Sequence, residues 1–343
     1  MSDKVCGFCR KLLRIPLLAR HWGNELYKSV LVTGGCGFIG ANLCRRLLQG
    51  GIRVTVLDNL ARGPSSNIEG LDVEFILGDV RHPEVLARAI HGVEAIIHLA
   101  AFGSVVESVS RLQENFDVNV GGTVSVLRAA AQTGVKVVFA SSGGAVIGVA
   151  AGAVDEQSLP RPMSPYGASK LCGEAYCHAF ASSFGLQTVA LRFANVYGPF
   201  SAHKRGAVTN FITALMSGEP IGVFGDGSAT RDFIYVDDLC DGIYAALRTE
   251  LPPGIVLHLA TGIETTVARL ASTLARVAGQ PQHPIRYSAK RPGELERNFA
   301  NFARAHELLG FSPLVSLEEG LLRTWRWFQH QPVTSLSAIK SDS

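Results

Sequence analysis

Residues 30–40 read VLVTGGCGFIG and combine a short apolar run with three regularly spaced glycines. The apolar run predicts a buried strand, and the residues that follow it are typical of a helix. Gly34, Gly37 and Gly40 lie at the turn between them, where the lack of a Cβ lets backbone N–H groups approach a phosphate. The stretch therefore predicts a strand, a turn and a helix that bind the pyrophosphate of a dinucleotide.

Small and acidic residues follow the next candidate strands. Asp58 ends the second strand, where an acid bonds the ribose hydroxyls of adenosine and repels a 2′-phosphate, so NAD is favoured over NADP. Asp79 ends the third strand and is expected to bond the adenine amino group, and small residues follow the fourth strand. Open α/β sheets bind ligands at these carboxyl ends. The residues expected to contact NAD on this pattern are Gly34, Gly37, Phe38, Ile39, Gly40, Asp58, Asn59, Asp79, Val80, Leu99, Ala100 and Ala101.

Apolar runs alternate with helix-like segments from Ser29 onward, which is the pattern of a parallel sheet covered by helices on both faces. The predicted fold is α/β: a Rossmann-type doubly wound parallel sheet with a smaller, discontinuous C-terminal lobe that binds the substrate. The predicted strands are 30–33, 53–57, 73–77, 95–99, 136–140, 188–193, 221–224 and a return strand at 256–259. Helices are predicted near 208–216, 236–247 and 317–328.

The order of these segments predicts a division of the chain. An NAD-binding domain is expected over residues 29–198, and residues 236–261 are expected to return to it. The substrate lobe is predicted from residues 199–235 and 262–330, with an N-terminal extension at 1–28 and a tail at 331–343.

Composition excludes several classes of protein. Among 343 residues, 18% are charged and the formal net charge is +3, which is too small for a nucleic-acid surface and typical of a globular α/β protein. The seven cysteines are an odd number, which indicates buried thiols in a reducing compartment, so the cytoplasm is the expected location. Cys6 and Cys9 have no second ligand pair, so no metal is expected. No apolar run is long enough for a membrane span.

Residues 164–170 read SPYGASK and predict the start of a helix, with a serine before a proline at its first position. Tyr166 and Lys170 then lie one turn apart on one face of that helix. A tyrosine is a poor base at neutral pH, but a nearby ammonium and a positively charged nicotinamide stabilise the phenolate. The pair can therefore take a proton from a sugar hydroxyl while hydride leaves the same carbon.

These motifs together resemble the extended short-chain dehydrogenase/reductase family, in its branch of NAD-dependent nucleotide-sugar epimerases and dehydratases, with UDP-hexose 4-epimerases among the likenesses. The resemblance covers roughly residues 29–328. It is carried by TGGCGFIG (33–40), Asn119 with Gly122 and Thr123, SSGGAVIG (141–148), YGASK (166–170), LRFANVYGP (191–199), GDGSATRDFIYVDDL (225–239) and RPGE (291–294).

The resemblance implies roles for individual residues. Tyr166 is the expected acid/base, and Lys170 its activator and a ligand of the nicotinamide ribose. Asn119 and Ser141 join the residues expected near NAD. Arg231 and Arg291 are expected to clamp the substrate diphosphate by charge-assisted hydrogen bonds. The full expected set of substrate residues is Ser142, Tyr166, Asn195, Asn210, Arg231, Arg291 and Asn298.

Two departures from the family pattern affect this assignment. The position that carries the catalytic Ser or Thr in the family corresponds to Gly143 in this chain. The role is therefore assigned to Ser142, with Ser141 as the alternative. His258 and Ala260 replace the Asn and Gly of a later Asn-x-Gly-x-Gly motif.

The residues after Ser142 favour one reaction. Members of this branch begin by oxidising C4 of the sugar, and 4,6-dehydratases place an acidic pair after the catalytic hydroxyl, where this chain has Gly143 and Gly144. A nucleotide-sugar 4-epimerase is therefore predicted. A dehydratase, decarboxylase or reductase of the same family is the alternative, and a catalytically silent NAD-binding scaffold or sensor is the alternative of another class.

The substrate and the assembly are predicted only by resemblance. A UDP-sugar is expected, and Asn298 falls beside the C2 substituent, which leaves hexose, N-acetylhexosamine and uronate open. A homodimer is expected through helices around 105–133 and 166–183, and polysaccharide precursor supply is the usual setting of the family.

Overall fold

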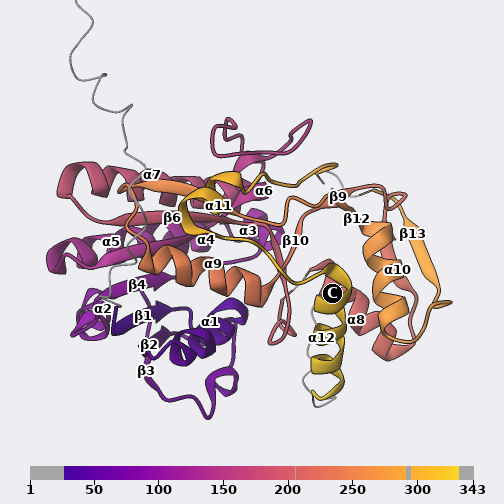
Figure 1. Ribbon diagram of the computed structural model, residues 1–343, viewed down its shortest axis with the longest axis horizontal. Coiled ribbons are helices and arrows are strands. Elements are labelled where there is room, and N and C mark those ends of the chain that lie inside the picture. Colours follow the sequence, from indigo (N-terminus) through magenta and orange to yellow (C-terminus); the bar gives the residue numbers. More distant parts are fainter. Residues whose placement is uncertain (1–26, 205, 291–294, 332–343) are drawn as a thin grey trace, which may run out of the picture.

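The structure is a computed structural model that describes residues 27–204, 206–290 and 295–331. Its centre is a seven-stranded sheet in the order β11-β6-β5-β4-β1-β2-β3, and every neighbouring pair is parallel (Figure 1). The strands are β1 (Ser29–Thr33), β2 (Arg53–Asp58), β3 (Val73–Leu77), β4 (Ala95–His98), β5 (Lys136–Ser142), β6 (Thr188–Phe193) and β11 (Ile255–Leu259). The predicted doubly wound sheet and the return strand are confirmed.

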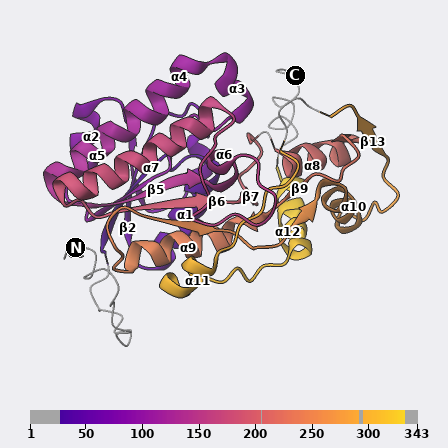
Figure 2. The same cartoon turned by 90° about the horizontal axis from the view of Figure 1, so that it is seen from above.

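Helices cover both faces of this sheet (Figure 2). One face carries α1 (Phe38–Gln49), α9 (Val236–Arg248) and α11 (Ala303–Leu309). The other carries α2 (Pro83–Ile90), α5 (Gly122–Thr133) and α7 (Pro165–Phe184). Because successive side chains of a strand point to opposite faces, each strand supplies both layers. In β1, for example, Val30 and Val32 join the core under α1 and α9, whereas Leu31 joins the core under α2, α5 and α7.

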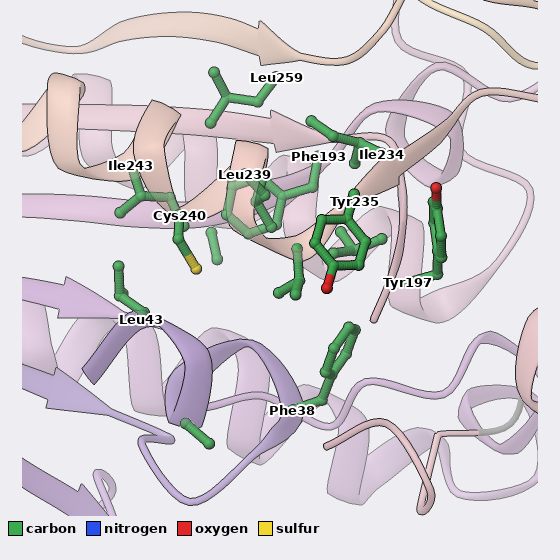
Figure 3. Packing of buried hydrophobic residues seen from close by; sticks show 14 of the residues in the cluster. Phe38, Leu43, Phe193, Tyr197, Ile234, Tyr235, Leu239, Cys240, Ile243 and Leu259 are labelled. Carbon is green, nitrogen blue, oxygen red and sulfur yellow. The ribbon is translucent and has the colours of Figure 1, made fainter. Parts of the chain in front are cut away.

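The layer formed by α1 and α9 connects the predicted cofactor turn to the rest of the chain. Figure 3 shows Leu43 of α1 facing Cys240 and Ile243 of α9 across an apolar interface. Phe38 and Tyr235 belong to the same core, so the first residue of α1 packs on the segment that precedes α9. This packing fixes the N-terminus of α1 relative to the segments that follow β6.

The remaining elements lie beyond the carboxyl ends of the strands (Figure 1). Three two-stranded sheets pair β10 with β7, β12 with β9, and β13 with β8. Their bounds are β7 (Asn195–Tyr197), β8 (Ile221–Phe224), β9 (Thr230–Arg231), β10 (Phe233–Tyr235), β12 (Thr265–Thr266) and β13 (Ile285–Ser288). The helices here are α8 (Ala207–Ser217), α10 (Val267–Val277) and α12 (Leu317–Gln329), and α10 packs against the other two.

Short helical segments complete the main sheet region. They are η1 (Ser65–Ile68), α3 (Val105–Ser110), α4 (Leu112–Phe116), η2 (Asp117–Gly121) and α6 (Gly143–Ile147). Within the described ranges, no helix has the length and apolarity that a membrane span needs. Cys36, Cys44, Cys177 and Cys240 are buried thiols and Cys172 is half-buried, whereas Cys6 and Cys9 lie outside the described residues.

Candidate functional site

The glycine turn after β1 is shaped by close backbone contacts. Gly34 has a φ of +73°, and a Cβ there would lie 2.7 Å from the backbone nitrogen of Ala100. A Cβ on Gly40 would lie 2.3 Å from the carbonyl oxygen of Gly34. Gly37 is the N-cap of α1, whose first turn has no acidic residue and no side-chain cap. The N–H groups of that turn are therefore directed at an anion site, which fits a dinucleotide pyrophosphate.

Asp58 and Asp79 lie at the carboxyl ends of β2 and β3, as expected. The Asp58 carboxylate accepts hydrogen bonds from the backbone N–H of Cys36 at 2.9 Å and of Leu60 at 2.7 Å. Its pKa is raised by burial, and these two bonds oppose the rise. Hydrogen bonds from Arg81 and Asn59 hold the pKa of Asp79 at about 2. Asp79 therefore carries a negative charge at neutral pH.

The other residues expected near the cofactor surround this turn. Ala100 N–H donates to the hydroxyl of Thr33 at 3.2 Å, which holds the end of β4 against the end of β1. Leu99, Ala100 and Ala101 are half-buried there. The side chain of Val80 is buried in the core on the α2 side, so only its backbone can face a ligand.

Tyr166, Lys170 and Ser142 come together at the carboxyl end of β5. Helix α7 begins at Pro165, and the hydroxyl of Ser164 caps it by accepting from the N–H of Gly167 at 3.1 Å, as predicted. The Lys170 ammonium donates to the carbonyl oxygen of Ala140 at 2.8 Å and lies 5.8 Å from the centre of the Tyr166 ring.

The protein's own groups leave the Tyr166 phenol protonated at neutral pH. Burial raises its pKa to about 12, and a hydrogen bond with Ser142 opposes that shift. Burial also lowers the pKa of the Lys170 ammonium to about 8, and Glu174 opposes this shift. A further positive charge beside the phenol is needed for the tyrosine to act as a base near pH 7. The oxidised nicotinamide, which the sequence predicts beside this pair, would supply that charge.

A buried ion pair lies behind these residues. Arg192 donates to Glu174 through two nitrogens, at 2.9 and 2.8 Å, and both side chains are about 5% exposed or less. The Ser141 hydroxyl donates to the same carboxylate at 2.5 Å. Ser141 is thus engaged by Glu174, while Ser142 is the hydroxyl that reaches Tyr166. Sequence reasoning missed Glu174 and Arg192, although Glu174 follows Lys170 by one helical turn.

Asn119 lies in a π-helical turn between α4 and α5 and holds two chain segments together. Its side-chain oxygen accepts from the N–H of Phe102 at 2.7 Å, and its amide donates to the hydroxyl of Ser169 at 2.9 Å. Ser169 neighbours Lys170 on α7. The buried asparagine therefore fixes α7 relative to the loop after β4.

Two positions that depart from the family pattern, Gly143 and His258, lie next to each other in the structure. A Cβ on Gly143 would lie 3.1 Å from Nδ1 of His258, so the imidazole occupies the space in which a side chain at 143 would stand. His258 is buried, and burial together with Arg192 lowers its pKa to about 4. A neutral imidazole at position 258 therefore goes together with glycine at position 143.

Introducing the usual serine at position 143 is expected to destabilise the protein, because the new side chain overpacks against His258. The expected loss is about 1–3 kcal/mol for Gly143→Ser, measured by denaturant unfolding. The double variant Gly143→Ser/His258→Asn is expected to regain part of that loss, with His258→Asn alone as the matched control. Additive losses in the double variant would contradict the coupling.

Several expected substrate residues lie beyond the carboxyl end of β6. Asn195 is exposed, and its amide donates to the carbonyl oxygen of Asp232 at 3.2 Å. Arg231 donates to the carbonyl oxygens of Thr230 and Leu295, both at 2.7 Å. Asn210 is exposed on α8. Arg291 lies outside the described residues.

Asn298 lies against the catalytic segment. A Cβ on Gly144 would come within 1.7 Å of Nδ2 of Asn298, so glycine at 144 makes room for this amide. The backbone carbonyl of Asn298 accepts from the N–H of Asp232 at 2.9 Å, next to Arg231. Asn298 thus lies between Gly144, which follows Ser142 by two positions in the chain, and the segment that carries Arg231.

Comparisons with known proteins agree with this geometry. The model of the NAD dependent epimerase/dehydratase family matches residues 30–260. The UDP-glucose 4-epimerase of Mycolicibacterium smegmatis is 38% identical over 312 residues, covering 88% of this chain and 98% of that protein.

Two solved structures are also similar over most of their length. A UDP-glucose 4-epimerase from Thermotoga maritima with UDP-glucose gives a TM-score of 0.83 at 35% identity, covering 88% of this chain and 98% of that one. A Thermus thermophilus UDP-glucose 4-epimerase in complex with NAD gives 0.82 at 35% identity, covering 89% and 100%. Matches of this extent show that the chain belongs to the NAD-dependent epimerase/dehydratase family.

Proposed function

We propose that this protein is an NAD-dependent nucleotide-sugar 4-epimerase that acts on a UDP-hexose. The observation that carries the proposal is the convergence of Ser142, Tyr166 and Lys170 at the sheet edge that also holds the glycine turn. The proposed NAD site runs from Gly34 along the ends of β2, β3 and β4 to Lys170. Similarity to UDP-glucose 4-epimerases over almost their whole length supports the substrate class.

Each proton-transfer step is assigned to a residue of the site. NAD, when bound, supplies the acceptor for a hydride from C4 of the sugar and later returns it. Tyr166, as phenolate, removes the proton from the C4 hydroxyl, and the Lys170 ammonium stabilises the negative charge of that phenolate. Ser142 hydrogen-bonds to the phenol oxygen of Tyr166 and to the C4 oxygen of the sugar, and so keeps the C4 hydroxyl oriented toward the phenolate. After the 4-ketone has turned its other face, Tyr166 returns the proton to the new hydroxyl.

The surroundings of Ser142 argue against dehydration. Elimination across C5 and C6 needs a further acid and base, and the positions after Ser142 are Gly143 and Gly144. The buried carboxylate on the same helix as Tyr166, Glu174, is held by hydrogen bonds from Arg192 and Ser141. The geometry therefore favours epimerisation over 4,6-dehydration.

The chain is proposed to divide as its sequence predicts, with NAD on residues 29–198 and the nucleotide sugar held by 199–235 and 262–330. The return of β11 to the edge of the main sheet, and the location of α8, α10 and α12 beyond the strand ends, support this division. Free thiols at the five described cysteines support a reducing compartment, and the cytoplasm is proposed.

The test is a panel of UDP-sugars incubated with the purified protein and NAD, with products resolved by chromatography. Interconversion of two C4 epimers without net NADH identifies the epimerase and its sugar, whether hexose, N-acetylhexosamine or uronate. A 4-keto-6-deoxy product, release of carbon dioxide or net NADH turnover would replace the proposal with a sibling reaction. Tight NAD binding with no turnover of any sugar would favour a silent scaffold.

We also propose a homodimer that buries the outer face of α3, α4 and α7. Val106, Val109, Leu112 and Phe116 are 54–74% exposed on α3 and α4, and Phe184 at the end of α7 is 66% exposed. Helices α3 and α4 both pack on α7, so the three helices that carry these apolar groups form one layer of the molecule (Figure 2). An apolar surface of this kind on a folded protein is typical of a contact between subunits.

Replacing Val109 with aspartate is expected to convert the dimer to a monomer, because an unpaired charge would be buried in the contact. Light scattering after size-exclusion chromatography measures the mass directly. Leu314→Asp, at a residue that is 85% exposed in the C-terminal part, is the matched control and is expected to stay dimeric. A monomeric wild-type protein would contradict the proposal.

A further inference from the structure

Lys204 brings an ammonium group close to the first residue of α1. It lies in the loop between β7 and α8, and its ammonium is 5.5 Å from the centre of the Phe38 ring. Phe38 is the first residue of α1, directly after Gly37. The ammonium donates one hydrogen bond, to the carbonyl oxygen of Val196 at 2.5 Å. Two of its three donor positions therefore remain for another acceptor.

The loop that carries Lys204 is fastened to α1. Asn42 of α1 donates from its amide to the carbonyl oxygen of Pro199 at 3.0 Å. The guanidinium of Arg45, one turn further, lies 4.1 Å above the ring of Phe200. The N–H of Lys204 itself donates to the carbonyl oxygen of Ser201 at 2.9 Å, which closes the turn. These contacts hold the ammonium at a set place relative to the N-terminus of α1.

The charge of Lys204 has no counter-ion in the described part of the chain. Burial alone lowers its pKa, to about 8, and no carboxylate offsets that effect. Nearby ionisable groups are also basic: Arg62 and Lys204 both lower the pKa of His203, after the larger effect of burial. Arg62 is paired with Glu107 at 2.6 Å. An ammonium that is partly desolvated and unpaired among basic neighbours is typical of an anion site.

We propose that Lys204 binds a diphosphate where the N-terminus of α1 meets the loop after β7. Its ammonium and the free N–H groups of the first turn of α1 then act on the anion from two sides. Two diphosphates can occupy this region: the pyrophosphate of the cofactor and the diphosphate of the nucleotide sugar. The inference rests on the proposed function for the identity of these two ligands, and on the position of Lys204 for the contact.

Binding of each ligand is measured separately by titration calorimetry, with NAD on the cofactor-free protein and UDP on the NAD-saturated protein. Lys204→Met removes the charge and keeps the length of the side chain, and Lys204→Arg keeps the charge. We expect Lys204→Met to weaken one of the two ligands by about tenfold or more, as for a lost charge-assisted hydrogen bond, and Lys204→Arg to restore most of it. Lys28→Met, at an exposed lysine before β1, is the matched control and is expected to bind as wild type.

Ligands without a diphosphate distinguish the loss of a direct contact between Lys204 and the diphosphate from a loosening of the loop that carries Lys204. Adenosine and uridine, measured by competition, are expected to bind Lys204→Met as they bind wild type. Selective loss of NAD affinity assigns Lys204 to the cofactor pyrophosphate, and selective loss of UDP affinity assigns it to the nucleotide sugar. Unchanged affinity for both, or an equal loss for the nucleosides, would overturn the inference. Wild-type protein that binds NAD and UDP without epimerising any sugar would refute the proposed function and leave this inference standing.

Discussion

Tyr166→Phe is expected to lower kcat for epimerisation by about two to four orders of magnitude, because the proposed mechanism transfers the C4 hydroxyl proton through the phenol oxygen that this variant lacks. Ser142 interacts with the phenol, and the ammonium of Lys170 lies 5.8 Å from the ring centre, so the variant removes only the acid/base atom of the set. The rate is measured with the UDP-sugar that the panel identifies, by chromatography of the product.

The control for this variant lies on the same helix. Tyr176→Phe removes a hydroxyl from a side chain that is 39% exposed, ten residues further along α7, and is expected to retain wild-type turnover. Affinity for NAD is expected to change little in Tyr166→Phe, which separates a lost proton step from a lost cofactor. Turnover within tenfold of wild type would show that another residue carries the proton.

Glu174→Leu is expected to lower the free energy of unfolding by about 3–5 kcal/mol, because it leaves the guanidinium of Arg192 buried without its carboxylate. The pair is almost fully buried, and the same carboxylate accepts from Ser141. Removing Glu174 also takes away a charge that supports the protonated form of Lys170, so its pKa is expected to fall further. Denaturant unfolding measures the stability, and the pH dependence of turnover reports the change in the pKa of Lys170.

Two comparisons test the cause of that loss. Glu174→Leu/Arg192→Leu removes both charges and is expected to be more stable than Glu174→Leu alone, because an apolar pair leaves no unpaired ion. Glu319→Leu breaks the exposed pair with Arg323 on α12 and is expected to change stability by less than about 1 kcal/mol. Equal losses at the buried and the exposed pair would show that desolvation is not the source of the effect.

Local patterns predicted the framework of the site because each pattern lies within one short segment. The turn from Gly34 to Gly40 needs only a strand, three glycines and a helix, and its backbone contacts are as expected. Tyr166 and Lys170 share a helix face through their spacing, and the Ser164 cap marks where that helix begins. The apolar runs predicted the strands, and the positions of the acids at the strand ends were predicted from them.

The sequence by itself therefore determined the fold class, the dinucleotide turn and the tyrosine–lysine pair, because hydrophobic periodicity and helical spacing act over a few residues. Only the tertiary structure shows that Glu174 engages Ser141 whereas Ser142 reaches Tyr166, because neighbouring residues on a strand face opposite ways, and Ser142 stays the proposed catalytic hydroxyl. It also brought His258 to Gly143, Asn298 to Gly144 and Lys204 to Phe38. These contacts join residues 115 to 166 positions apart in the chain, and such contacts are set by how packed layers meet and not by any local pattern.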